Sequence, residues 1–289
     1  MHWVRYSIFT LIGIVALFKS IYFYSDGFRL DKIDRYLLLQ DEAITDRTIA
    51  IDPDVKKILS QPFRYLAKGR QSYAFISQDD QYVLKLVRTH KFIKPLWSKH
   101  LPWLAVMRLE ALEDKIQRHA RAIKSYTLAS NKLKKASQII TSSFSQTPLV
   151  GGPVFVTLVD GIGREHQINL QRVYFILQKK AVSLDRYFSK LIKEKKDKEL
   201  SEAVDAFFLH IATRAKQKIF NRDYRNAMRN MGWLNNQIID CDVGSFYEDV
   251  NGLSYSEEID HFRETISHFL VDKQFDIDLN SSVEKICFQ

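Results

Sequence analysis

The stretch Asn221–Phe246 carries the side chains of this chain that are best suited to hold a metal ion. Asp223 lies in a polar loop, Asn230 follows it, and Asp242 belongs to an Asp-x-Gly turn. Between Asn230 and Asp242, two short apolar runs flank Asn235-Asn236, a pair suited to a tight hairpin turn because Asn tolerates a positive φ. We therefore expect these oxygen-bearing side chains at one end of a rigid hairpin, where they would suit a hard cation such as Mg²⁺.

A second candidate, Lys85, lies within an apolar strand. The runs Leu66–Phe75 and Gln81–Val87 alternate apolar and polar residues around a Gln-Asp-Asp turn, a pattern that predicts a β-hairpin. A charge inside such a strand is costly unless it faces a cleft or finds a partner. The alternative is that Lys85 lies on an edge strand, where a Lys discourages aggregation.

The order of the expected elements resembles the catalytic segment of the protein-kinase superfamily. A loop is followed by a strand, a turn, a second strand and the Asp-x-Gly turn. The family pattern is His-Arg-Asp, four residues, Asn and then Asp-Phe-Gly. Asn221 stands in place of the His and Val243 in place of the Phe. The resemblance implies that Asp223 is the catalytic base and that Asp242 binds the metal.

The Asn of this pattern has two candidates. Asn230 comes directly before the first strand of the hairpin, where the family's Asn lies, but it follows Asp223 by seven residues rather than five. Asn226 lies too far from the hairpin. We favour Asn230 as the second metal ligand, which implies a catalytic loop two residues longer than usual.

The upstream hairpin fits the same family. Lys85 lies in the run YVLKL and resembles the Lys of the V-A-I-K motif, so the resemblance implies that it holds the nucleotide phosphates. Only Gly69 remains of the glycines that usually cover the phosphates. Gly69, Gln71 and Ser72 are expected to offer backbone N–H groups in their place.

A long amphipathic helix is expected over Leu101–Ser137. Glu110 and Glu113 lie one turn apart on it, and the resemblance implies that one of them pairs with Lys85. Both remain candidates, although Glu113 falls within the better-formed apolar stripe. The alternative for each is a surface Glu paired with a cation on the next turn.

Two strands rich in Val, Phe and Ile are expected over Pro153–Asp160 and Arg172–Leu177. A short polar link and a helix follow the second strand, and the resemblance identifies this link as the hinge between lobes. The backbone of Gln178 through Lys180 would then meet the adenine edge. A further amphipathic helix, Leu200–Phe220, leads into the acidic loop.

The implied architecture is α+β: a two-lobed protein-kinase-like fold with a small antiparallel-sheet N-lobe and a reduced helical C-lobe, preceded by an N-terminal hydrophobic helix. We expect an anchor over residues 1–24, a helical linker over 25–61, an N-lobe over 62–178 and a C-lobe over 179–289. The segment after Asp-x-Gly is too short for the activation segment and helical subdomain that bind peptide substrates. Compact kinases of small molecules, lipids or lipopolysaccharide are therefore the nearer comparison.

The apolar run Tyr6–Phe18, extended past Lys19 to Tyr24, predicts a membrane anchor. Bulky residues follow the run, so no small-x-small cleavage site is present. Cations after the segment outnumber those before it, which places the body of the protein in the cytoplasm by the positive-inside rule. The alternative is a buried N-terminal core helix.

The chain has 289 residues, a net charge of +9 and two cysteines. This cysteine count does not make a disulfide framework. Basic runs such as Lys190–Lys198 are solvated helix faces in most proteins, and beside an anchor they would attract anionic lipid. No motif with base-stacking aromatic residues accompanies the charge, so nucleic acid is not the expected partner.

The residues together predict a membrane-anchored kinase-like phosphotransferase that uses ATP and Mg²⁺ and transfers the γ-phosphoryl group to a hydroxyl. The acceptor, whether a sugar, a lipid headgroup or a protein, stays open. A pseudokinase that binds nucleotide or serves as a scaffold is the alternative, favoured by the depleted glycine loop. A third hypothesis is a basic adaptor whose binding depends on salt and ignores Mg-ATP.

Overall fold

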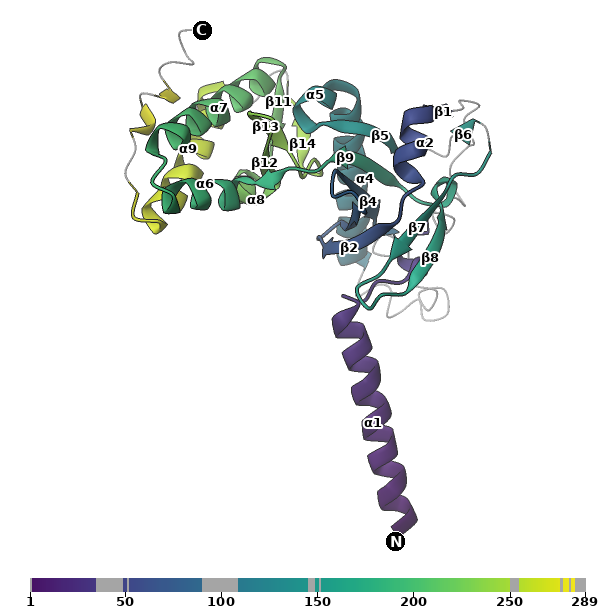
Figure 1. The fold of residues 1–289 in the computed structure, drawn as a ribbon. Coiled ribbons are helices and arrows are strands. Elements are labelled where there is room, and N and C mark those ends of the chain that lie inside the picture. Colours follow the sequence, from purple (N-terminus) through teal and green to yellow (C-terminus); the bar gives the residue numbers. More distant parts are fainter. Residues whose placement is uncertain are drawn as a thin grey trace. The chain divides into compact units, whose positions relative to one another are not determined.

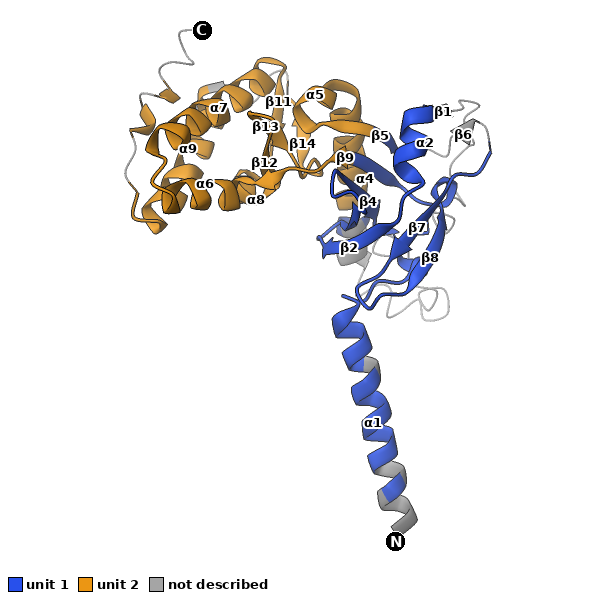
Figure 2. Cartoon of the chain, viewed as in Figure 1, with its two compact units in different colours: residues 1–116, 141–177 blue, residues 117–140, 178–289 orange. Residues whose placement is uncertain are grey.

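The computed structural model describes residues 2–34, 49–50, 52–89, 109–144, 149–150, 152–249, 255–275, 278–280 and 282–283. The chain forms two compact units (Figure 2). Unit 1 consists of Met1–Ile116 and Thr141–Leu177, and unit 2 consists of Gln117–Ile140 and Gln178–Gln289. The architecture is mixed α+β with a largely antiparallel sheet.

A seven-stranded sheet with the order β5-β9-β4-β3-β2-β7-β8 forms most of unit 1 (Figure 1). Neighbours β2–β3, β3–β4 and β7–β8 pair antiparallel, whereas β2–β7 is parallel. The strands of this sheet are β2 Phe63–Lys68, β3 Ser72–Ser77, β4 Tyr82–Val87, β5 Ile139–Ser143, β7 Phe155–Val159, β8 Glu165–Asn169 and β9 Phe175–Lys179.

The predicted hairpin β3–β4 is confirmed, and its turn shows why it forms. Asp80 adopts a φ of 59°, a left-handed conformation that Asp tolerates better than most residues. The carboxylate of Asp79 accepts hydrogen bonds from the Ser77 hydroxyl at 2.6 Å and from the Gln81 backbone N–H at 3.1 Å. Alternating side chains such as Tyr73 and Phe75 are then fully buried, as a half-buried strand requires.

Strand β4 has β9 on one side and β3 on the other. Lys85 pairs with Ala74 in the β3–β4 register and is half-buried. The alternative interpretation of Lys85 as an edge-strand Lys is therefore wrong, because its strand is an interior one.

Short elements complete unit 1. Strands β1 and β6 pair in parallel, and the carboxylate of Asp52 caps α2 by accepting the Asp54 N–H at 2.8 Å. These elements are η1 Leu30–Lys32, β1 Ile49–Ala50, α2 Pro53–Leu59, β6 Leu149–Val150 and η5 Leu170–Arg172.

Unit 2 is mainly helical, with small antiparallel pairings β10–β12–β13 and β11–β14. Its core joins apolar side chains of α6, α7 and α9, including the fully buried Phe188, Phe207 and Phe262. Helix α4 starts within unit 1 and ends within unit 2. The helices are α4 Leu109–Lys132, α5 Lys134–Ser137, α6 Leu184–Lys193, α7 Asp197–Lys216, η6 Tyr224–Asn226, α8 Ala227–Asn230 and α9 Tyr255–Asp272. The strands are β10 Val182–Ser183, β11 Ile219–Asn221, β12 Met231–Leu234, β13 Gln237–Asp240 and β14 Phe246–Glu248.

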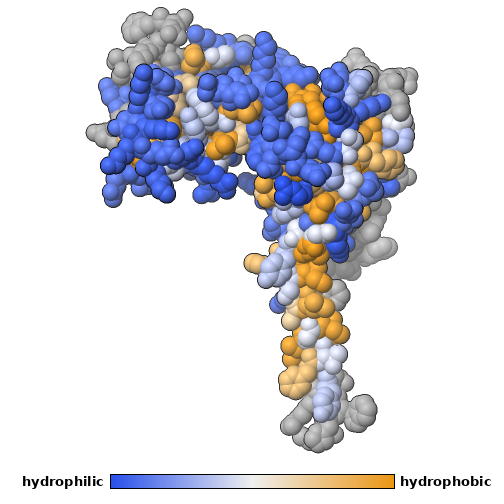
Figure 3. All heavy atoms as spheres, in the orientation of Figure 1, coloured by the Kyte–Doolittle hydropathy of each residue, from blue (hydrophilic) through white to orange (hydrophobic). Residues whose placement is uncertain are grey.

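The N-terminal segment forms helix α1, His2–Tyr24, and apolar residues follow one another along it (Figure 3). Phe9 and Phe23 are 71% and 76% exposed, so the alternative of a buried core helix is wrong. Among the described residues, no helix combines the length and the apolarity that crossing a bilayer demands. The single-pass anchor and the orientation deduced from it are therefore also wrong. The uninterrupted apolar run stops at Lys19, short of the roughly 20 residues that a span needs.

Candidate functional site

The site in unit 2 is built on the hairpin β12–β13. Met231 pairs with Asp240 and Leu234 with Gln237, as the predicted register requires. Asn235 and Asn236 adopt φ values of 49° and 59°, so the expected tight turn through the Asn pair is confirmed. The hairpin therefore brings its two ends, and the side chains attached to them, to the same place.

Two amide side chains flank the Asp223 carboxylate. The Nδ2 group of Asn226 donates to Oδ1 at 2.7 Å, and the Nδ2 group of Asn230 donates to Oδ2 at 2.9 Å. The side chain of Asn221 accepts the backbone N–H of Asp223 at 2.8 Å. Both candidate Asn residues therefore contact the same carboxylate, and Asn221 helps to fix the loop.

The backbone carbonyl of Asn230 connects this loop to the Asp-x-Gly turn. It accepts the N–H groups of Cys241 at 2.7 Å and Asp242 at 2.8 Å. The chain between Asp223 and Asn230 forms η6 and the single turn of α8, which ends at Asn230. Asn230 and Asp242 are therefore neighbours although their positions in the sequence lie on opposite sides of the hairpin.

The Asp242 side chain is exposed. Its Oδ1 atom accepts the Gly244 N–H at 3.1 Å, so the carboxylate is oriented by its own turn. Asn230 uses its Nδ2 group on Asp223, which leaves its Oδ1 atom as an acceptor. A carboxylate and a carboxamide oxygen are donors that suit Mg²⁺, which commonly keeps several waters and takes few protein ligands. In the part of the chain that the structure describes, no three His, Cys, Asp or Glu side chains form a metal cluster.

Helix α4 holds the turn after Asp242 in place. The Ser125 hydroxyl donates to the Val243 carbonyl at 2.6 Å and accepts the Phe246 N–H at 2.6 Å. The neighbouring Tyr126 is buried, and burial, followed by the Asp242 charge, raises the pKa of its hydroxyl well above the ordinary value. The role of this Ser could not be predicted from the sequence, because its partners lie 118 and 121 positions away along the chain.

Beneath the site, Asp240 belongs to a buried ionic network. Its Oδ2 atom lies 2.9 Å from Nε2 of His210, and its Oδ1 atom accepts from Nη1 of Arg214 at 3.0 Å. Nη2 of Arg214 also donates to Glu258 at 2.8 Å. The Arg214 side chain is fully buried, and its guanidinium lies 5.0 Å from the ring centre of Phe246. His210 is thus a packed residue with a carboxylate partner.

Charge and burial act in opposite directions within this network. Burial alone would raise the pKa of Asp240, but the charges of His210 and Arg214 outweigh it and hold the pKa below its ordinary value. Burial prevails at Glu258 and raises its pKa despite the nearby Arg214. Asp240 is therefore a structural anion.

Gln178 also supports this end of the hairpin. Its Nε2 group donates to the carbonyls of Ser137 at 2.6 Å and Asp240 at 2.7 Å, and its side chain is buried. The backbone N–H of Lys179 donates to the Gln138 carbonyl at 3.1 Å. Lys180 is half-buried. The sequence suggested a backbone role for this link and missed the role of the Gln178 side chain.

The candidates in unit 1 are placed on the β2–β3 and β3–β4 hairpins. The Gly69 backbone N–H donates to the Ser72 carbonyl at 2.8 Å, so this N–H closes a turn and does not project toward a ligand. Arg88 contacts the same turn, donating from Nη1 to the Gly69 carbonyl at 3.1 Å. The side chains of Glu110 and Glu113 lie outside the described residues.

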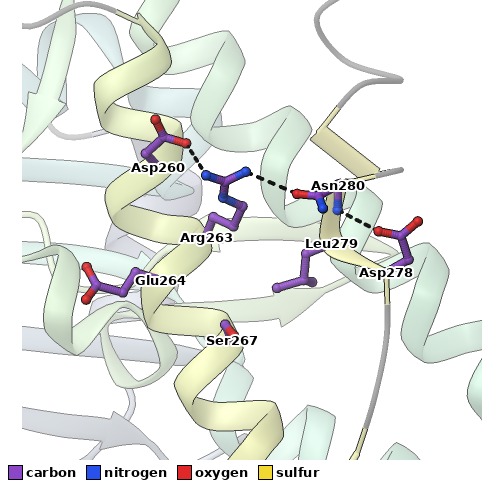
Figure 4. Close-up of a pocket in the computed structure, with 7 residues that line it drawn as sticks. All are labelled: Asp260, Arg263, Glu264, Ser267, Asp278, Leu279 and Asn280. Carbon is purple, nitrogen blue, oxygen red and sulfur yellow. Dashed lines mark hydrogen bonds and ion pairs between the residues drawn. The ribbon is translucent and has the colours of Figure 1, made fainter.

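A separate pocket lies between α9 and residues 278–280 (Figure 4). Arg263 bridges its two walls, with an ion pair to Asp260 at 2.8 Å and a hydrogen bond to Asn280 at 3.1 Å. The Asp278 carboxylate accepts the Asn280 N–H at 3.0 Å. These groups bind one another, and none of them belongs to the site around Asp223.

Comparison with known proteins gives little. No family model matches the chain, and no curated protein matches its sequence. A solved structure of the bifunctional kinase-methyltransferase WbdD aligns with a TM-score of 0.32 and 11% identity. That alignment covers 68% of this chain and 43% of the other, so the chain spans less than half of the protein it matches. A likeness this distant leaves the function to the geometry of the site.

Proposed function

We propose that this protein is a kinase-like phosphotransferase that moves the γ-phosphoryl group of ATP to a hydroxyl acceptor. The proposal is carried by one observation: Asp223 is flanked by two amides and connected through Asn230 to the exposed Asp242. This is the arrangement that a catalytic base beside a metal-binding carboxylate requires. The proposal includes a kinase-like N-lobe over residues 62–178 and C-lobe over 179–289.

In the proposed step, Asp223 orients the acceptor hydroxyl and takes its proton as the hydroxyl oxygen bonds to the γ-phosphorus. The bond from that phosphorus to the β,γ-bridging oxygen breaks, and ADP leaves. The amides of Asn226 and Asn230 fix both carboxylate oxygens of Asp223. Since phosphoryl transfer depends mainly on positioning and charge neutralisation, a base with so little freedom is favourable.

Asp242 and the amide oxygen of Asn230 would hold Mg²⁺, which would neutralise charge on the phosphates when bound. Lys85 would bind the phosphates of the nucleotide, and Glu113 would pair with it. Gln178 and Lys180 would lie beside the adenine. Gln71 and Ser72 are the remaining candidates of the phosphate-covering loop, because the Gly69 N–H already binds the Ser72 carbonyl.

The test compares binding with turnover in matched variants. Mg-ATP should raise the Tm of the full chain, and Asp242→Asn should abolish this rise because it removes the metal-binding charge. Asp223→Asn should keep the rise but lose phosphoryl transfer, measured as ADP release. Asp197→Asn, the same change at an exposed helix start of unit 2, is the control and should behave like the natural chain. A chain that Mg-ATP does not stabilise would refute the proposal.

The closed turn at Gly69 favours a second candidate, a pseudokinase that binds nucleotide or a partner without turnover. Because the Gly69 N–H already donates to the Ser72 carbonyl, the phosphate-covering loop has one hydrogen-bond donor fewer for the γ-phosphate. This candidate predicts an Mg-ATP rise in Tm that Asp242→Asn removes, with no ADP release from the natural chain. ADP release that disappears in Asp223→Asn would rule it out.

A further inference from the structure

Unit 2 carries a basic groove of about 850 Å³ that no part of the proposed mechanism uses. Helices α6 and α8 and the end of α9 form its walls, and these helices lie together in the same unit (Figure 1). Five cations line it: Arg186, Lys190, Lys193, Arg229 and Lys273. We call it the basic groove.

Among the described residues, few of these cations are held in a close ion pair, although Glu194 interacts electrostatically with both Lys190 and Lys193. Among the described residues, Arg186, Lys193 and Arg229 form no ion pair. Lys273 lies over the ring of Phe269, with Nζ 5.9 Å from the ring centre. Lys190 is 3.9 Å from a carboxylate oxygen of Glu194, a long contact between exposed groups that contributes little.

Three carboxylates also line the groove, and two of them are already engaged. Glu194 accepts from Lys196 at 2.9 Å. The Asp185 carboxylate accepts the Arg186 backbone N–H at 2.7 Å, at the start of α6. The third, Asp272, is the last residue of α9. The groove therefore keeps a positive excess, which an anion would neutralise.

The position of the groove connects it to the site. Arg229 directly precedes Asn230 in the single turn of α8, so the two Cα atoms are about 3.8 Å apart. Met228 and Phe269 provide an apolar surface among the cations. Two Arg side chains suit phosphate in particular, because each planar guanidinium can donate two parallel hydrogen bonds.

We propose that the basic groove binds the phosphate group of a phosphorylated small-molecule acceptor and so directs its free hydroxyl to Asp223. This inference rests on the proposed function and names the class of its substrate. It predicts that a phosphate-rich anion binds the groove without metal or nucleotide.

Inorganic pyrophosphate in EDTA is the probe, and its Kd for the full chain is measured by calorimetry. The double variant Arg186→Glu/Arg229→Glu should bind pyrophosphate at least tenfold more weakly. Lys134→Glu/Lys216→Glu is the control, because it makes the same change in net charge at exposed positions of unit 2 outside the groove. The control should bind like the natural chain. Should the double Glu variant not fold, Arg186→Gln/Arg229→Gln replaces it, with the same direction of change.

Two results would overturn the inference: no binding of pyrophosphate, or equal weakening of binding in the groove and control variants. The Mg-ATP shift in Tm, measured on the same variants, separates the two proposals. If the groove variant keeps the Mg-ATP shift and also binds pyrophosphate normally, the groove inference fails and the phosphotransferase proposal survives. If Mg-ATP never stabilises the chain while the groove variant loses pyrophosphate, the anion site survives and the phosphotransferase proposal fails.

Discussion

Asp240 and Asp242 are separated by one residue and have opposite surroundings. Asp240 is 1% exposed and bonds to His210 and Arg214. Asp242 is exposed, and its carboxylate accepts the Gly244 N–H from its own turn. Strand β13 ends at Asp240, so Asp240 keeps the inward direction of the strand, whereas Asp242 lies in the turn beyond it and does not follow the strand's alternation. The first carboxylate therefore holds the hairpin, and the second is available for a ligand.

The largest effect should follow from removing the cation that compensates the buried carboxylates. Arg214→Met would leave Asp240 and Glu258 buried without it, and should lower the free energy of unfolding by about 3–5 kcal/mol. Urea denaturation measures the change. Arg263→Met, which removes a partly exposed pair with Asp260, is the control and should cost at most about 1 kcal/mol. Equal losses would show that the buried network is not what stabilises the hairpin.

Asp240→Asn should lower the free energy of unfolding by about 2 kcal/mol at neutral pH, because it removes charge-assisted bonds to His210 and Arg214. The pKa of Asp240 lies below its ordinary 3.8, so the natural chain should lose this contribution only as the pH falls through that lowered pKa. Urea denaturation of the natural chain and of Asp240→Asn at several pH values measures the difference in their free energies of unfolding. A loss that stayed constant down to the most acidic pH would contradict the electrostatic explanation.

His119 on α4 shows the effect of burial on a group whose charged form is positive, in contrast to the carboxylate of Asp240. Burial lowers its pKa from 6.5 to about 4, so the unfolded chain binds a proton between these values and the folded chain does not. The free energy of unfolding should therefore fall as the pH drops from 6.5 toward 4, by on the order of 2 kcal/mol. His119→Gln should flatten this part of the pH profile, and His268→Gln, at an exposed position of α9, should not.

Asp242→Asn should change the free energy of unfolding least, by less than about 0.5 kcal/mol, because exposed substitutions rarely cost more. Its effect should instead appear in function, as loss of the Mg-ATP shift in Tm. This variant and Asp240→Asn should thus show opposite profiles in the same two measurements. A marked loss of stability in Asp242→Asn would remove the distinction between the two carboxylates.

Local patterns in the sequence predicted much of this site. The positive φ of Asn235 and Asn236 follows from their residue type, and the alternation over β4 identified the strand that carries Lys85. Strand β8 was missed because only Ile168 in it is buried, which leaves no alternation to detect. The prediction of a membrane anchor was wrong because the apolar run is interrupted by the charge of Lys19.

Partners that are distant in the sequence could not be predicted. Asp240 meets Arg214 from 26 residues away and Gln178 from 62, and no periodicity of a single strand reveals such contacts. The same limit hid the role of Glu258, which lies 44 residues from Arg214. Residue type and spacing pointed to the candidate side chains Asp223 and Asp242, while the buried network beside them could be found only in three dimensions.

The hydrogen bonds of Ser125 have a consequence for the order of folding. They join residues separated by 118 and 121 positions, Val243 and Phe246. Contacts between such distant segments form slowly, because closing a long loop costs entropy before any contact compensates it. During synthesis, the chain must extend past Phe246 before α4 can hold the Asp242 turn. A shorter, incomplete chain therefore has no finished site with which to bind a nucleotide prematurely.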